Sequence, residues 1–252
     1  MSNISGTRAA DHTQRPLSQI KAVVFDTFGT VVDWRTGIAR EAAPFIARHG
    51  LGVAPEAFAD DWRRRYQPAM EPIRAGQRPY VPLDTLHREN LVDLLAELAP
   101  GATWPGEELS ELTRAWHRLD PWPDAIAGLA RLKQRTIIGP LSNGNIALLL
   151  NMAKRAGLPW DVILGSDISR AYKPHPTAYT ATAAALGIAP AECMLVAAHN
   201  GDLTAARRAG LATGFVARPR EHGPRQTIDL APSDDWEVVA SDFVDLAERF
   251  GC

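Results

Sequence analysis

The stretch KAVVFDTFGT, residues 21–30, is the part of the sequence that decides the fold. Its apolar run ends at Asp26, and the turn-forming residues TFGT follow at once. A short apolar run bounded by turn residues predicts a strand that is buried on both faces, as strands of parallel sheets are. Open parallel sheets bind ligands beyond the carboxyl ends of their strands. Asp26 is therefore either a capping residue in a strand-to-loop turn or a nucleophilic carboxylate in a ligand site.

Further apolar runs of the same character follow, and helical patterns lie between the later ones. Strands are predicted at residues 21–26, 135–142, 160–166, 193–198 and 212–217. Helices are predicted near 145–157, 175–187 and 202–210, and the last short strand and helix are predicted within 236–250. Strands that alternate with helices predict an α/β fold with a doubly wound, parallel, Rossmann-like sheet.

The connection between the first two predicted strands is far longer than one crossover needs. Residues 36–120 contain no convincing strand pattern, and helical patterns cover 36–50, 55–70, 83–99 and 106–119. We therefore expect a helical cap domain at 36–120, inserted after the first strand. The core domain would comprise 19–35 and 121–252, and residues 1–18 would form a flexible tail.

The composition excludes several classes of partner. The 252 residues include 27 Lys and Arg and 29 Asp and Glu, a net charge of -2, which gives no electrostatic case for nucleic acid or an anionic membrane. No apolar run is long enough to span a bilayer, and the first residues lack the apolar segment of a signal peptide. Cys193 and Cys252 are the only cysteines. We expect no disulfide and a cytoplasmic location.

Polar residues follow several of the predicted strands. Ser142 and Asn143 follow the second strand, Lys173 lies in a later loop, and Asp202 precedes a helix. Each has an ordinary alternative explanation, which is a helix cap for the first two and for Asp202, and a solvated surface position for Lys173. Together with Asp26, they place one group at each of four strand ends, which is the convergence that a reacting site needs.

This set of motifs, with the insert after the first strand, resembles the haloacid dehalogenase superfamily from about residue 20 to the C-terminus. That superfamily consists mostly of magnesium-dependent phosphatases, so the resemblance implies the fold but not the reaction. Its phosphatases carry an aspartate two residues after the nucleophile, where this chain has Phe28, and another at the position of Ala198. Phe28 cannot protonate a leaving group, and Ala198 cannot supply an oxygen ligand to magnesium. Both residues suit a substrate without phosphate.

The branch that the chain resembles is the L-2-haloacid dehalogenases, whose nucleophile motif has an aromatic residue followed by Gly-Thr. The resemblance implies that short 2-haloalkanoic acids become 2-hydroxyacids through an aspartyl ester, with no metal or organic cofactor. Asp26 would be the nucleophile, held ionised by Thr30 and Lys173. Asp202 and His199 would orient the hydrolytic water.

The resemblance also implies the groups that bind the substrate. Its carboxylate would meet Ser142, Lys173 and backbone N–H groups near Thr27 and Phe28. Phe28 would also form an apolar wall that keeps the nucleophile dry.

The halide would be received by Arg63, which follows Trp62 on a cap helix, and by Asn143. Arginines 64 and 65 in the same run have a solvated helix face as their ordinary explanation. Tyr66 would help to exclude water, and Tyr179 matches a family tyrosine near the lysine loop.

The chain departs from this branch in its fourth motif. It has Ala197 and His199 where serine and asparagine are usual, and Gly201 where an aromatic residue often stands. Asn200 does not restore the register. A hydrogen-bond donor near the halide suits a small, hard fluoride, so fluoroacetate is a candidate substrate.

Two other functions remain open from the sequence. The first is a magnesium-dependent small-molecule phosphatase with an altered site, against which Phe28 and Ala198 argue. The second is a non-catalytic binding protein of the same fold. The expected partner is a small haloacid, and a homodimer, which is usual in this branch, is a further expectation, although no interface signature was found in the sequence.

Overall fold

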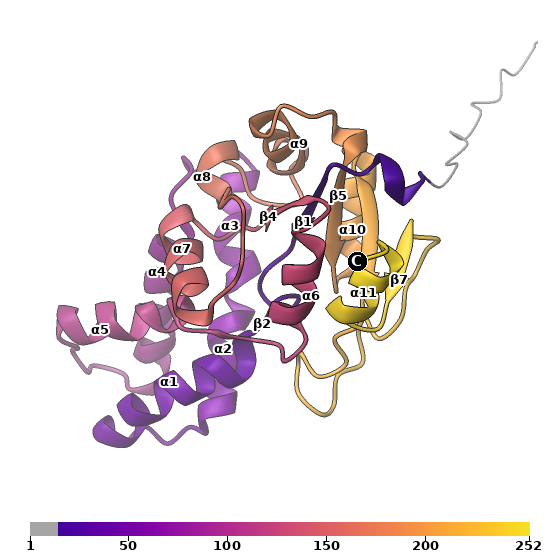
Figure 1. Ribbon diagram of the computed structural model, residues 1–252. Helices are drawn as coiled ribbons and strands as arrows, with labels where there is room; N and C mark the ends of the chain where they lie inside the picture. Colours follow the sequence, from indigo (N-terminus) through magenta and orange to yellow (C-terminus); the bar gives the residue numbers. More distant parts are fainter. Residues whose placement is uncertain (1–14) are drawn as a thin grey trace, which may run out of the picture.

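The structure is a computed structural model that describes residues 15–252 (Figure 1). Five parallel strands form one sheet in the order β4-β1-β5-β6-β7. Their bounds are Ile137–Pro140, Ala22–Phe25, Cys193–Ala197, Ala212–Val216 and Val238–Ala240. All residues of β1, β5 and β6 are buried, as their unbroken apolar runs predict.

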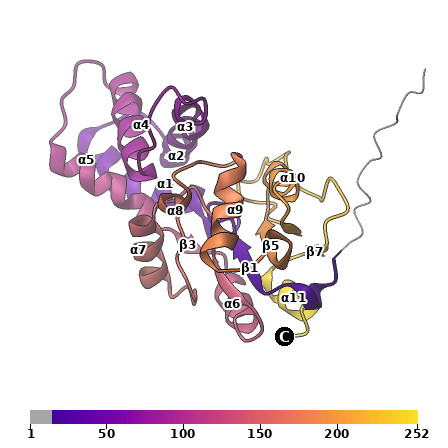
Figure 2. The same cartoon turned by 90° about the horizontal axis from the view of Figure 1, so that it is seen from above.

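Helices cover both faces of the sheet, as Figure 2 shows from above. One face carries α6 (Ala125–Leu132) and α11 (Phe243–Arg249), and the other carries α9 (Pro176–Ala185) and α10 (Asn200–Arg208). Between β4 and α9 lie α7 (Ile146–Ala156) and α8 (Ser166–Ser169). The chain adds short 3-10 helices at Leu17–Gln19 and Pro190–Glu192.

The strand register brings three loops to one edge of the sheet. Phe25 is paired with Pro140 on one side and with Val196 on the other. The residues that follow β1, β4 and β5 therefore begin at the same level. A site at this edge is built from loops that the central strands hold in place.

Helices fill the long connection after β1. They are α1 (Trp34–His49), α2 (Pro55–Arg64), α3 (Tyr66–Arg74), α4 (Leu83–Leu98), α5 (Gly106–Thr113) and a 3-10 helix at Arg114–His117. At the base of this insert, β2 (Val32–Asp33) pairs antiparallel with β3 (Asp120–Pro121). The helix predicted over 55–70 is divided after Arg64, because Pro68 has no N–H to donate to the Arg64 carbonyl.

One sequence-based prediction of the core was wrong, and one helix was missed. Residues 160–166 form no strand, and only an isolated bridge joins Leu141 to Leu164. The Asp161 carboxylate accepts the Ile138 N–H at 3.0 Å, so a side chain takes the place of a backbone partner beside β4. The helix α6 was missed. Its Gly128 lies against the backbone of Phe243, where a Cβ would come within 2.3 Å of the carbonyl oxygen, so this glycine marks close helix packing and not a turn.

The predicted tail lies mostly outside the described residues, which begin at residue 15. Its last residues make contacts with the core. Arg15 donates a hydrogen bond to the Gly210 carbonyl at 3.0 Å, and the 3-10 helix Leu17–Gln19 follows.

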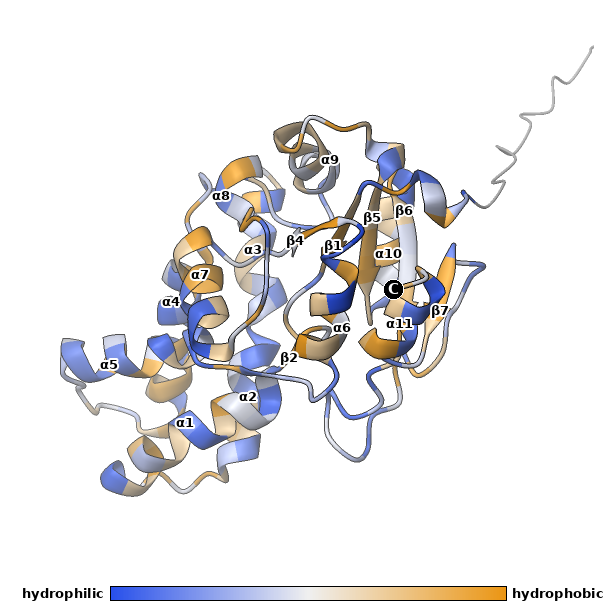
Figure 3. Ribbon diagram, viewed as in Figure 1, coloured by the Kyte–Doolittle hydropathy of each residue, from blue (hydrophilic) through white to orange (hydrophobic). Residues whose placement is uncertain are grey.

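The apolar core is continuous from the sheet into the insert helices. One cluster of buried side chains contains Val23 and Phe25 of β1 together with Trp62 of α2 and Leu91 of α4. Figure 3 shows the hydrophobic strands inside and hydrophilic residues on the outer helices. Within residues 15–252, no helix is both long and apolar enough to cross a membrane.

Candidate active site

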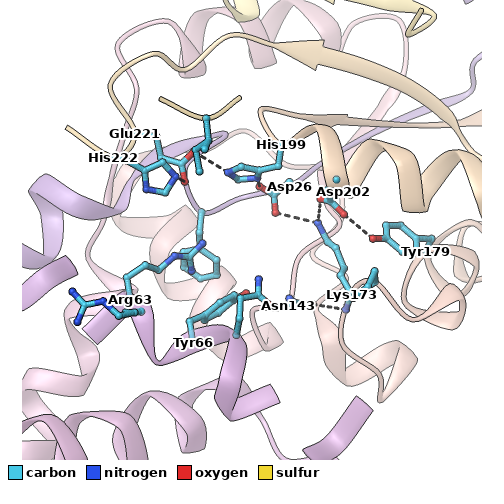
Figure 4. Close-up of a pocket in the computed structure, with 16 residues that line it drawn as sticks. Asp26, Arg63, Tyr66, Asn143, Lys173, Tyr179, His199, Asp202, Glu221 and His222 are labelled. Atoms are coloured by element: carbon cyan, nitrogen blue, oxygen red, sulfur yellow. Dashed lines mark hydrogen bonds and ion pairs between the residues drawn. The ribbon is translucent and has the colours of Figure 1, made fainter. Parts of the chain in front are cut away.

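A cavity of about 580 Å³ lies where the loops after β1, β4 and β5 meet helices α2 and α3. Nine residues predicted as site residues line it: Asp26, Phe28, Arg63, Tyr66, Asn143, Lys173, Tyr179, His199 and Asp202. The structure does not place Thr27, Thr30 or Ser142 among the lining residues. Figure 4 shows Arg63 and Tyr66 on the opposite side of the cavity from His199 and Asp26.

Asp26 is held by three side chains. Thr30 Oγ1 donates to its Oδ2 at 2.7 Å, Lys173 Nζ lies 3.0 Å from its Oδ1, and His199 Nδ1 lies 3.2 Å from its Oδ2. The Asp26 backbone N–H is bonded to the Val196 carbonyl. These contacts fix the direction of both carboxylate oxygens at the end of β1.

The surroundings of Asp26 keep it ionised. Burial would raise the pKa of its carboxyl, but the charges and hydrogen bonds of Lys173, His199 and Thr30 outweigh burial and hold that pKa well below its usual range. Burial would likewise lower the pKa of Lys173, and the carboxylates of Asp202 and Asp26 raise it instead. The pair is therefore a buried ammonium beside a buried carboxylate.

Asp202 holds Lys173 from the other side. Lys173 Nζ donates to Asp202 Oδ2 at 2.6 Å, and Tyr179 donates its hydroxyl proton to Asp202 Oδ1 at 2.7 Å. Burial, followed by the nearby Asp202 charge, raises the pKa of Tyr179, which stays a neutral donor. Both Asp202 oxygens are thus engaged by the protein.

The predicted strand before Lys173 is absent, so this residue reaches the site from the loop between α8 and α9. Asn143 places that loop, because its Oδ1 accepts the Lys173 backbone N–H at 2.8 Å. Ser142 accepts the Gly144 N–H at 3.1 Å and so shapes the turn that carries Asn143. The Thr27 hydroxyl is buried and has no partner within residues 15–252.

His199 binds a second carboxylate that the sequence did not reveal. Its Nε2 lies 2.8 Å from Glu221 Oε2, and Trp34 Nε1 donates to Glu221 Oε1 at 3.0 Å. Burial would lower the pKa of His199, but Glu221 and Asp26 raise it well above its usual value. His199 is an imidazolium between two carboxylates while Asp26 is free.

Glu221 explains the glycine in the first loop. A Cβ on Gly29 would lie 2.0 Å from Glu221 Oε1, and Gly29 has a φ of +90°. Only glycine meets both conditions. The one signal that could have found Glu221 is its place after β6, at the same edge of the sheet; no spacing or charge pattern in ARPREHG marks it.

Arg63 lies among aromatic rings. Its guanidinium carbon is 4.1 Å from the centroid of the Tyr66 ring, 5.3 Å from that of Trp34 and 5.9 Å from that of Phe28. Its Nη1 is buried and has no hydrogen-bond partner within the described chain. Burial raises the pKa of Tyr66, although the Arg63 charge opposes it, so the phenol is neutral. The arginine offers the buried Nη1 as a free donor to an anion in a pocket walled by aromatic rings.

A family model of haloacid dehalogenase-like hydrolases matches residues 20–210. The chain is 33% identical over 204 residues to the (S)-2-haloacid dehalogenase of Xanthobacter autotrophicus, a match that covers 79% of this chain and 76% of that protein. This chain is a haloacid dehalogenase-like hydrolase. The family inferred from Asp26, Ser142, Lys173 and Asp202 is therefore confirmed.

Solved structures agree with this assignment. A crystal structure of a defluorinating L-2-haloacid dehalogenase superposes with a TM-score of 0.90 at 58% identity, covering 92% of this chain and 96% of that one. An L-2-haloacid dehalogenase from Xanthobacter autotrophicus with chloropropionic acid covalently bound gives a TM-score of 0.75 at 26% identity, covering 91% and 97%. The predicted α/β, Rossmann-like fold is confirmed.

This haloacid dehalogenase-like hydrolase does not have the donor set of the family's magnesium site. Phe28 and Ala198 offer no oxygen where the phosphatases of the superfamily place aspartates. Within residues 15–252, no group of three or more His, Cys, Asp or Glu side chains could hold a metal ion. The cationic side chains that contact Asp26 are Lys173 and His199.

The hydrolase has further cavity-lining residues that the sequence analysis missed or set aside. They are Arg64, Gln67, Pro174, Glu221, His222 and Ile228. Arg64 is largely exposed, as expected for a helix face, and still borders the cavity. Arg65 pairs with Glu97 and does not line the cavity. Glu221, His222 and Ile228 all come from the segment after β6, so that segment forms one wall.

Proposed function

We propose that the protein hydrolyses short 2-haloalkanoic acids to 2-hydroxyacids through an ester on Asp26. The observation that carries this proposal is an ionised, oriented carboxylate beside Phe28, a residue that cannot assist the departure of an alcohol from phosphate. The relatives named as (S)-2-haloacid dehalogenases, one with chloropropionic acid covalently bound, support it. A magnesium phosphatase is less consistent with this donor set.

In the first step, an oxygen of Asp26 attacks C2 of the substrate from the side opposite the halogen. The new bond is a carboxylate ester, and the carbon–halogen bond breaks with both electrons leaving on the halide. The free Nη1 of Arg63 and the amide of Asn143 are the donors placed to receive the halide. Back-side attack inverts C2.

The substrate carboxylate needs donors next to Asp26. The backbone N–H groups of Thr27 and Phe28 bond to no other group in the part of the chain that the structure describes. Lys173 adds positive charge at the same place. Ser142 is turned toward Gly144, so we assign it to the turn and not to direct substrate contact.

The second step hydrolyses the ester, and His199 is the base that the geometry favours. Once Asp26 is alkylated it carries no charge, so one of the two carboxylates that keep His199 protonated is lost. The pKa of His199 falls as a result, although Glu221 still raises it, and in this mechanism His199 releases a proton to solvent before the water attacks. It accepts a proton from water as the hydroxide oxygen attacks the Asp26 carboxyl carbon. The bond between the Asp26 carboxyl carbon and the ester oxygen then breaks, and the 2-hydroxyacid leaves with the second proton of that water on its hydroxyl oxygen. The ion pair of Asp26 with His199 is restored.

Asp202 supports this step indirectly. Its two oxygens already accept from Lys173 and Tyr179, so it fixes the ammonium more readily than it activates water. The net reaction consumes one haloacid and one water and yields one hydroxyacid, one halide and one proton.

Fluoroacetate remains a candidate substrate for a different reason from the one that the sequence suggested. Both nitrogens of His199 face carboxylates, so His199 is not a donor to the halide. Arg63 is the free donor instead. A structural relative at 58% identity is described as defluorinating, which supports the candidate.

We also propose the domain division expected from the sequence, with a core of 19–35 and 121–252 and a cap of 36–120. The antiparallel pair of β2 and β3, which joins the two ends of the insert, supports this division. A homodimer and a cytoplasmic location stay predictions.

The test is halide release from fluoro-, chloro- and bromoacetate and from both enantiomers of 2-chloropropionate, in the presence of EDTA. We expect the wild type to release halide and Asp26→Asn to release none, because an amide oxygen is a far weaker nucleophile. Single turnover in ¹⁸O-labelled water should place the label in Asp26 and not in the product. Full activity of Asp26→Asn would contradict the mechanism. Magnesium-dependent release of phosphate from a phosphate ester, without halide release from any haloacid, would favour the phosphatase.

A further inference from the structure

Asn200 stands between two cavity-lining residues, His199 and Gly201, yet its side chain does not line the cavity. Its amide binds the segment that follows β6. Nδ2 donates to Asp229 Oδ1 at 2.9 Å and to the Ala231 carbonyl at 3.0 Å, and the Asn200 backbone N–H donates to the same Asp229 oxygen at 3.0 Å. Oδ1 accepts from the Ser233 N–H at 2.9 Å.

The same amide oxygen also accepts from Trp236 Nε1 at 3.1 Å. Every hydrogen-bonding position of the amide is thus occupied by residues 229–236. Asp229 has a φ of +53°, in the left-handed region that aspartate enters more readily than most residues other than glycine. The contact is specific to these side chains, because a hydrophobic residue at either position would leave the other without its partner.

A second set of bonds continues from Asp229 to the catalytic end of the segment. Gln226 Nε2 donates to the Ile228 carbonyl at 3.0 Å, and Gln226 Oε1 accepts the His222 N–H at 3.0 Å. His222 is adjacent to Glu221, the partner of His199. The segment 221–236 is therefore anchored at one end through Glu221 and at the other through Asn200, which is next to His199 in the chain.

We propose that Asn200 is a positioning residue that holds the segment 221–236 so that Glu221 stays in contact with His199. The proposal rests on the proposed function, in which this pair acts on the ester. It assigns Asn200 no contact with the substrate. Loss of the contact should slow hydrolysis of the ester and leave the attack by Asp26 largely unchanged, because Thr30 and Lys173, from other elements, still hold one Asp26 oxygen each when His199 shifts.

The variant that tests this is Asn200→Asp. It keeps the size of the side chain and the acceptor for Ser233, but it cannot donate to Asp229 and sets two carboxylates against each other. The reciprocal double variant, Asn200→Asp with Asp229→Asn, restores one donor and one acceptor with the same net charge as the wild type. The control is Ser233→Ala, which leaves the Ser233 backbone N–H in place.

The measurement is rapid-quench turnover of chloroacetate, with chloride release reporting the attack and mass spectrometry reporting the decay of alkylated Asp26. We expect Asn200→Asp to decay about ten- to a hundredfold more slowly at an unchanged first-turnover chloride rate. We expect the double variant to regain the lost rate and Ser233→Ala to match the wild type. Wild-type decay in Asn200→Asp, an equal loss in both steps, or no rescue by the double variant would each overturn the proposal.

A structural measurement separates this proposal from the proposed function. Trypsin cleaves after Arg220 and Arg225, which are exposed at the start of the segment. We expect faster cleavage there in Asn200→Asp and wild-type protection in the double variant. If the wild type released no halide, the proposed function would fail while this result still reported on the Asn200 contact; unchanged cleavage in Asn200→Asp would overturn the contact itself.

Discussion

At the scale of single residues, the site is a chain of alternating charges: Lys173, Asp26, His199 and Glu221. Each buried charge has an opposite charge at hydrogen-bond distance. Buried charges are tolerated under that condition. The chain also couples the two proposed steps, because alkylation removes the charge of Asp26 from its middle. The state of His199 then depends on Glu221 alone among the carboxylates that contact it.

Glu221→Gln tests that coupling. Glutamine keeps the size of the side chain but has one acceptor oxygen in place of the two that face His199 and Trp34, and it carries no charge. The pKa of His199 therefore falls and His199 becomes a weaker base. We expect kcat for chloroacetate to fall about a hundredfold, with alkylated Asp26 accumulating in the mass spectrum of the intact protein. First-turnover chloride release should stay near the wild-type rate. A low kcat without any accumulated ester would contradict the role of Glu221 in hydrolysis.

A second prediction at the scale of single residues concerns His87, on α4, and the pH dependence of stability. His87 is buried beside Phe28, its ring stacks on Trp116 at 4.2 Å, and neither of its nitrogens has a partner within residues 15–252. Burial lowers the pKa of His87 to about 3. The unfolded chain binds this proton near the ordinary pKa of histidine and the folded chain does not. The free energy of unfolding is therefore unaffected above pH 6.5 and falls as the pH drops toward 3.

The corresponding prediction is that His87→Phe flattens this pH dependence. In the wild type, His87 should cost about 1.4 kcal/mol of unfolding free energy for each pH unit below 6.5. Urea unfolding of the two proteins at pH 7.5, 5.5 and 4.5 gives the difference, with pH 7.5 as the control because His87 is neutral in both states there. A constant difference across the three values would mean that His87 finds a hydrogen-bond partner or charges without unfolding.

At the scale of elements, the predictable part of the site is the part that strands carry. The run AVVF is buried along its whole length, so Asp26 had to emerge at the edge where β4 and β5 also end. The apolar run and the turn residues after it were enough to predict this position of Asp26. Arg63 lies on an amphipathic helix, and only the family resemblance separated it from its neighbours Arg64 and Arg65.

The elements that the sequence concealed are those with no pattern of their own. The segment 221–236 contains no helix or strand, and its place is set by single side chains such as Asn200 and Glu221. Residues 160–166 look like a strand because they are apolar, but the Asp161 side chain takes a backbone position beside β4. Tertiary contacts that depend on one side chain leave no periodic trace, and therefore pattern analysis cannot find them.

At the scale of the whole molecule, the helices of the insert are bound to the core near the site by polar contacts as well as by the shared apolar cluster. Asn145, before α7, donates its Nδ2 to Asp84 Oδ2 at 2.9 Å and accepts the Asp84 N–H at 3.2 Å. His117 Nε2 lies 2.9 Å from the other Asp84 oxygen. These bonds join the start of α4 in the insert to the start of α7 in the core.

The prediction at this scale is that the insert and the core unfold in one transition. The contact of Asn145 with Asp84 should contribute to the free energy of that unfolding. Asn145→Ala removes the partner of a half-buried Asp84 carboxylate oxygen and of the Asp84 backbone N–H, so we expect a loss of about 1 kcal/mol in the free energy of unfolding. Tryptophan fluorescence, to which both the insert (Trp62, Trp116) and the core (Trp160, Trp236) contribute, should show one transition that coincides with the one seen by far-UV circular dichroism. Asn151→Ala is the matched control, since Asn151 is exposed and contacts only the far side of His117, at 3.0 Å. Two separate transitions in the wild type would contradict the shared core, and equal losses in the two variants would remove the special role of Asn145.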